Sequence, residues 1–175
     1  DTLETAVAWA SALGRRDGPS ALALSRQTLP VIARDPARAA DIARGGYVLS
    51  DAADAQAVLI ATGSEAGLAL QAQKLLAERG VAVRVVSMPS TSVFDRQEAA
   101  YRNRVLPRHL PTIAVEAAHP DFWRKYVGRD GAVIGMPTFG ESAPAADLFE
   151  HFGFTAERVA QAVQACLCEA AAPID

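Results

Sequence analysis

Short apolar segments alternate with helical patterns through most of this sequence, and this alternation constrains the fold more than any other feature. The segments are rich in Val, Ile and Ala, and they predict buried strands at Val58–Ala61, Val81–Val86, Thr112–Val115 and Ala132–Ile134. Uninterrupted apolar strands separated by helices are typical of parallel sheets that are covered on both faces. The sequence therefore predicts an α/β fold, a mostly parallel sheet with helices on both faces.

Turn and capping signals place the helices between these strands. The turn Thr62-Gly63-Ser64-Glu65 leads into a helix that Gly80 stops. Asp95 is expected to open a second helix that runs to Arg104. The other helical patterns lie at Phe122–Tyr126, after Ser142-Ala143-Pro144 and after Thr155.

The N-terminal part of the sequence indicates a separate unit. A helix with apolar positions over Leu3–Leu13 comes first, and Ala21–Leu24 predicts a short buried strand. Residues 28–46 carry prolines and charges without a sustained period, which indicates a linker with one helical turn. We therefore expect a helix–strand remnant of a neighbouring α/β domain in residues 1–27, and a second domain in residues 47–175.

Composition excludes several classes of function. The chain has 175 residues, of which 50% are hydrophobic, which is typical of a globular protein. Its net charge of −3 does not favour binding to nucleic acid or to anionic membranes. No apolar run approaches the ~20 residues of a membrane-spanning helix. Cys166 and Cys168 fit reduced thiols of a cytoplasmic protein. The first residue is Asp1 rather than Met, and we expect the chain to be a piece of a longer polypeptide.

Arg26 is the first candidate functional residue. It follows the predicted strand Ala21–Leu24, and ligands of open α/β sheets bind outside the carboxyl ends of strands. A guanidinium there can hold a phosphate with two parallel hydrogen bonds, supported by Ser25 or Gln27. A surface arginine paired with an acid is the commoner role for this residue type.

The turn Thr62-Gly63-Ser64-Glu65 is the second candidate. A strand, a glycine turn and a helix start can bind an anion, although one glycine does not make a dinucleotide fingerprint. Ser64 and Glu65 are more often a helix cap.

Three further groups of residues could serve in catalysis or ligand binding, but each also fits a structural role. His109, His119 and His151 match no metal or nucleophile spacing. Glu141 can act as a general acid or base, but capping of the following helix is favoured. The aromatic cluster Phe122, Trp123 and Tyr126 is more typical of a core or a subunit interface than of base stacking.

Nine segments, taken in order, resemble the C-terminal part of bacterial transketolases. They are Asp17–Pro19, Ala23–Gln27, Ala43–Leu49, Ile60–Glu65, Arg84–Thr91, Ala114–Ala117, Lys125–Gly128, Thr138–Pro144 and Phe152–Thr155. The dehydrogenase β-subunits and deoxyxylulose-phosphate synthases share this architecture, but Ser25-Arg26-Gln27 and Gly140–Pro144 favour transketolase. The resemblance implies that residues 1–27 end the pyrimidine-binding domain, that 28–46 are the linker, and that 47–175 are the C-terminal domain.

The resemblance also implies a function. Transketolases transfer a two-carbon ketol unit between sugar phosphates, using thiamine diphosphate and a divalent metal (Mg or Ca) at sites between the two subunits of a homodimer. Arg26 aligns with the arginine that binds the substrate phosphate. The family's cofactor, metal and catalytic motifs have no counterpart here, so we expect no catalytic, cofactor-binding or metal residue, and no activity from this segment alone. A non-enzymatic anion-binding, regulatory or oligomerisation module is the alternative.

Overall fold

A sheet of five strands forms the centre of the molecule in a computed structural model that describes residues 1–34 and 40–171. The strands, in sheet order, are β1 (Tyr47–Ser50), β3 (Val83–Ser87), β2 (Ala57–Ala61), β4 (Thr112–Val115) and β5 (Ala132–Ile134). Neighbours pair in parallel, except that β1 runs antiparallel to β3 at one edge. The predicted mostly parallel α/β sheet is confirmed, and β1 is an addition to the four predicted strands.

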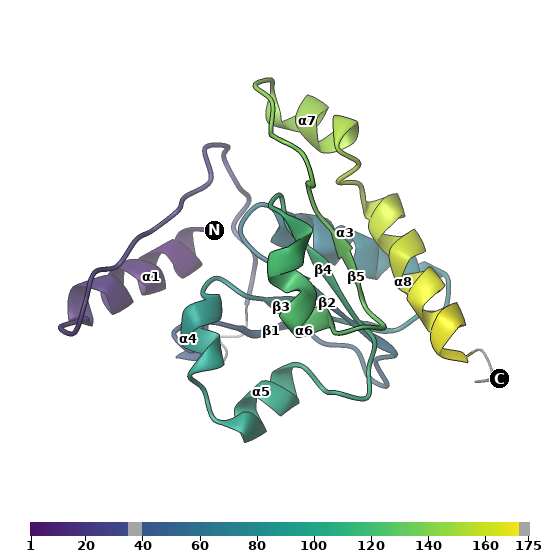
Figure 1. Ribbon diagram of the computed structural model, residues 1–175, viewed down its shortest axis with the longest axis horizontal. Helices are drawn as coiled ribbons and strands as arrows, with labels where there is room; N and C mark the ends of the chain where they lie inside the picture. Colours follow the sequence, from purple (N-terminus) through teal and green to yellow (C-terminus); the bar gives the residue numbers. More distant parts are fainter. Residues whose placement is uncertain (35–39, 172–175) are drawn as a thin grey trace.

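Helices cover both faces of this sheet (Figure 1). The helices are α1 (Thr2–Gly14), α3 (Glu65–Glu78), α4 (Thr91–Asp95), α5 (Ala99–Val105), α6 (Arg124–Val127), α7 (Ala145–His151) and α8 (Ala156–Ala171), with a 3-10 turn η1 at Pro120–Trp123. Helices α3 and α8 pack in one hydrophobic core, and α4, α5, η1 and α6 pack in the other.

Strand β2 shows why the sheet needs both layers. Its alternate residues Ala57, Leu59 and Ala61 join the core under α3 and α8, whereas Val58 and Ile60 join the opposite core. All of these side chains are fully buried, because successive residues of a strand point to opposite faces. A continuous apolar run is therefore the pattern of a central strand, as the sequence predicted.

Two predicted elements are wrong in detail. Ala21–Leu24 forms no strand, and Leu24 is 58% exposed. A strand needs a neighbour to satisfy its backbone groups, and none pairs with it within residues 1–34 and 40–171. Asp95 ends α4 instead of opening a helix. Its carboxylate accepts hydrogen bonds from Lys125 Nζ (2.8 Å) and Tyr126 Oη (2.9 Å), so it is not free to cap the next helix.

The N-terminal segment folds against the sheet domain by its first turn. Asp1 caps α1, and Asp1 and Glu4 form a reciprocal capping box. Residues 40–42 are helical, as expected of one turn in the linker, but part of that linker, 35–39, lies outside the described residues.

Candidate functional site

The ends of three parallel strands meet at one edge of the sheet. Ala61, the last residue of β2, pairs with Ser87 at the end of β3 and with Val115 at the end of β4. The chain segments that follow these strands therefore leave the sheet side by side. This carboxyl edge is where an open α/β sheet binds ligands.

The turn after β2 is built on a glycine in the left-handed region. Gly63 has a φ of +54°, and the amide of Glu65 donates to the carbonyl of Thr62 at 3.1 Å. This conformation favours glycine because a side chain there meets its own backbone. The turn carries the chain from β2 directly into α3.

Ser25 lies against this turn, which brings two distant sequence candidates together. Its Oγ is 3.5 Å from the position that a Cβ on Gly63 would occupy. The segment Ser25-Arg26-Gln27 therefore sits beside the carboxyl end of β2, although the predicted strand before it is absent.

Arg26 is exposed at this edge, and no acid within the described residues pairs with it. An unpaired guanidinium next to the carboxyl edge keeps its donors available for an anionic ligand.

Two glutamates follow β2 and β4 at the same edge. Glu65 is 3% exposed, accepts a hydrogen bond from Ser64 Oγ at 2.9 Å, and has its pKa raised by burial. Burial, and secondly the nearby charge of Glu65, raise the pKa of Glu116 to about 8. Oε2 of Glu116 is buried, and no hydrogen-bond partner reaches it from the described part of the chain. Glu116 is therefore mostly protonated at neutral pH.

Ser64 takes the N-cap position of α3 but makes no side-chain capping hydrogen bond. Its backbone is helical, at φ −63° and ψ −30°, and its hydroxyl donates to Glu65 instead of accepting from the next turn. The predicted side-chain cap is therefore wrong. The alternative of an external anion bound at this turn stays a prediction.

No hydrogen bond or ion pair within the described residues joins the remaining sequence candidates to Arg26 or to the Gly63 turn. His119 Nδ1 accepts from the amide of Asp121 at 3.4 Å, and His151 Nε2 is 3.9 Å from the exposed Glu141. The capping role predicted for Glu141 is wrong, because Pro144 takes the N-cap position of α7 without a side-chain hydrogen bond. His109 is exposed on the loop before β4.

The aromatic cluster lies partly in the core. Trp123 is 3% exposed and stacks at tilted or edge-on angles with Phe122 and Tyr126, at centroid distances of 5.6 Å in both pairs. Trp123 belongs to the core on the α6 face, with Tyr126 packed against it, whereas Phe122 is 52% exposed, so the core interpretation is confirmed for Trp123 and not for Phe122.

A buried polar cluster near the same edge was missed at the sequence level. It consists of Asp1, Glu4, Arg34, Tyr47 and Ser87. Ser87 Oγ and Tyr47 Oη (2.8 Å) both donate to Glu4 Oε1, and Arg34 Nε donates to Tyr47 Oη at 2.7 Å. Burial, followed by the charge of Glu4, raises the pKa of Tyr47. The spacing of Asp1 and Glu4 is a capping-box signal, but nothing in the sequence brings the other three residues to them.

The fold and its polar carboxyl edge define a mostly parallel α/β domain with candidate ligand-binding groups at the ends of its strands. The profile described as "Transketolase-like TK C-terminal domain" matches residues 45–155. Transketolase 2 of Vibrio vulnificus is 56% identical over 161 residues, covering 91% of this chain and 24% of that protein.

Solved structures agree with this match. A transketolase from Pichia stipitis, in complex with sedoheptulose-7-phosphate, superposes with a TM-score of 0.89 at 35% identity, covering 97% of this chain and 24% of its own. A transketolase from Leishmania mexicana gives a TM-score of 0.89 at 39% identity, covering 100% of this chain and 26% of its own. The chain belongs to the transketolase family, and it spans about a quarter of the length of the relatives it matches.

Proposed function

We propose that this chain is the C-terminal segment of a transketolase, and that Arg26 binds the phosphate of its sugar-phosphate substrates. The reaction transfers a two-carbon ketol unit from a ketose phosphate to an aldose phosphate. Arg26 is exposed beside the carboxyl end of β2 and pairs with no acid of residues 1–34 and 40–171, and this is the observation that supports the role. The Pichia stipitis relative was crystallised with a seven-carbon sugar phosphate, which is a substrate of the proposed class.

The chemistry of Arg26 is binding rather than bond making. A planar guanidinium donates two parallel hydrogen bonds to phosphate oxygens and keeps its charge at every relevant pH. The phosphate of a sugar lies far from the bond that breaks, so the contact is equally strong in the ground state and in the transition state. Such uniform binding lowers KM more than it raises kcat.

The described residues do not form a site for the cofactor of the proposed enzyme. Thiamine diphosphate, held through a divalent metal (Mg or Ca), would serve the reaction as its electron sink. Within residues 1–34 and 40–171, no group of three or more His, Cys, Asp or Glu side chains is arranged to hold a metal ion. We assign these residues to substrate binding and packing, and the cofactor to other parts of a homodimeric enzyme.

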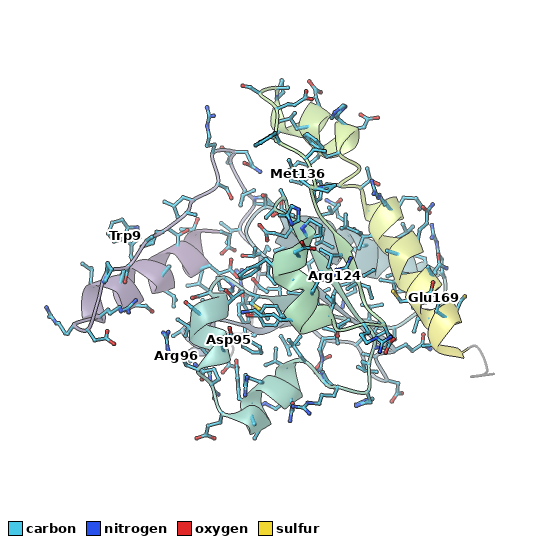
Figure 2. All side chains as sticks on the ribbon, viewed as in Figure 1. Trp9, Asp95, Arg96, Arg124, Met136 and Glu169 are labelled. Carbon is cyan, nitrogen blue, oxygen red and sulfur yellow. The ribbon has the colours of Figure 1, made fainter. Side chains whose placement is uncertain are left out.

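The proposed domain division is residues 1–27 as the end of the pyrimidine-binding domain, 28–46 as linker and 47–175 as the C-terminal domain. It is supported by large apolar side chains left exposed in the N-terminal segment: Leu3, Trp9, Leu13, Leu24 and Val31, at 36–70%. Figure 2 shows Trp9 pointing away from the sheet. Apolar side chains grouped in this way are typical of a surface that another part of a protein covers. No helix in the described residues is long and apolar enough to cross a membrane.

Replacing Arg26 by alanine tests the proposed function. In the complete transketolase, we expect Arg26→Ala to raise the KM for a ketose phosphate about 10- to 100-fold, since a hydrogen bond to a charged group contributes about 1.5–3 kcal/mol. The loss in kcat should be smaller. Steady-state kinetics give both constants.

Arg108→Ala is the matched control, because Arg108 is also exposed but lies on the loop before β4, at the opposite edge of the sheet. Its kinetics should equal those of the unaltered enzyme. An unchanged KM for phosphorylated substrates in Arg26→Ala would contradict the proposal.

A further inference from the structure

We propose that the buried cluster of Glu4, Arg34, Tyr47 and Ser87 holds Arg26 at the carboxyl edge of the sheet, which makes Tyr47 and Ser87 positioning residues for the substrate phosphate. This inference rests on the proposed role of Arg26. It concerns residues whose side chains are buried.

The cluster joins the N-terminal segment to the sheet at the edge that carries the candidate site. Tyr47 and Ser87 are directly opposite each other in the β1–β3 pair, and both donate to one oxygen of Glu4 on α1. Ser87 also pairs with Ala61, two residues before Gly63. The attachment point of α1 and the turn that contacts Ser25 are therefore adjacent on the sheet.

The same cluster closes the loop that carries Arg26. This loop leaves α1 after Gly14 and returns to the start of α1, where the amide of Ile32 donates to Asp1 Oδ2 at 2.9 Å. Arg34 then donates to Asp1 Oδ2, to the carbonyl of Ile32 (2.8 Å) and to Tyr47. The loop is therefore fixed at its return point by groups that are themselves bonded to β1 and β3.

Polar contacts, rather than apolar packing, make this attachment. As far as the structure describes the molecule, neither hydrophobic core includes a side chain from the first 34 residues. The side chains of Asp1 and Arg34 are each only 2% exposed, and that of Glu4 is 7% exposed. Within the described residues, these polar contacts join the loop that carries Arg26 to β1 and β3, so we expect a weakened cluster to shift Arg26 relative to the edge.

Removing one hydroxyl at a time tests the positioning role in the complete enzyme. Tyr47→Phe and Ser87→Ala each delete one donor to Glu4 and keep the ion pair of Arg34 with Asp1. We expect each to raise the KM for a ketose phosphate about three- to tenfold, because only part of the energy of a hydrogen bond to a carboxylate is transmitted to Arg26. The kinetics with the corresponding non-phosphorylated ketose should stay unchanged, because Arg26 acts only on the phosphate. Tyr126→Phe, which deletes a hydroxyl bonded to Asp95 instead, is the control and should leave both substrates unaffected.

A double-mutant cycle separates positioning from general destabilisation. If Tyr47 acts through Arg26, Tyr47→Phe will change KM little further in an Arg26→Ala background. The positioning role would be overturned if the two substitutions raised KM independently, so that their effects multiplied in the double variant. It would also be overturned if Tyr47→Phe raised KM equally for the phosphorylated and the non-phosphorylated ketose. An unchanged KM in Tyr47→Phe and Ser87→Ala while Arg26→Ala raises it would overturn the role as well. A silent Arg26→Ala variant would instead defeat the proposed function itself.

Discussion

Glu4→Ala is expected to release α1 and the loop up to Arg34 from the sheet domain of this chain. The substitution removes the acceptor of Tyr47 and Ser87 and leaves Arg34 buried with one carboxylate fewer. Removing one partner from a buried ionic cluster costs about 3–5 kcal/mol. The loss should fall on the attachment of the N-terminal segment, since residues 1–34 contribute no side chain to the two hydrophobic cores of the described part of the chain.

Hydrogen exchange and limited trypsin digestion can measure this release. The amide of Ile32, bonded to Asp1, should lose its protection, and cleavage at Arg15 and Arg16 should become faster. The thermal unfolding of the sheet, followed by circular dichroism, should change little. Glu78→Ala, at an exposed position near the end of α3, is the control. Protection of Ile32 that survives in Glu4→Ala would show that other contacts hold the segment.

Glu116→Gln is expected to make stability less sensitive to pH. The pKa of Glu116 is about 8 in the folded chain and near 4.5 in an unfolded one. Between these values the folded state keeps a proton that the unfolded state loses. The contribution of Glu116 to the free energy of unfolding is therefore fully present below pH 4.5 and is lost as the pH rises towards 8. The slope is at most about 1.4 kcal/mol per pH unit. Glutamine keeps the shape and does not ionise.

Denaturant unfolding of both chains at pH 5 and pH 8 checks this expectation. Glu116→Gln should exceed the unaltered chain in stability at pH 8 and differ from it much less at pH 5. Glu150→Gln, an exposed position on α7, should leave the pH dependence unchanged. Parallel pH profiles for the Glu116→Gln and unaltered chains would show that Glu116 ionises normally in the folded state.

The sheet was predictable from sequence because its strands are buried on both faces. Val58–Ala61 is an uninterrupted apolar run, and the structure extends it by one residue, to Ala57. The pattern around Asp95 was misleading. Aspartate often opens helices, but here its carboxylate accepts hydrogen bonds from Lys125 and Tyr126, about thirty positions away in the sequence. Contacts of that kind leave no local signal.

The candidate site was predictable only in its parts. Arg26 and the Gly63 turn could each be selected for their chemistry, and the transketolase resemblance favoured Arg26. That Ser25 rests against Gly63 depends on the path of the loop, which no periodicity encodes. In the cluster around Glu4, Ser87 bonds to a residue 83 positions away in the sequence, so only the folded chain assembles the cluster.

The central claim is that Arg26 holds the substrate phosphate, and a crystal structure of the complete enzyme with a bound ketose phosphate tests it most directly. We predict that two guanidinium nitrogens of Arg26 lie at hydrogen-bond distance from phosphate oxygens, about 2.7–2.9 Å. A phosphate held entirely by other groups, with the Arg26 guanidinium in solvent and out of contact, would contradict the account.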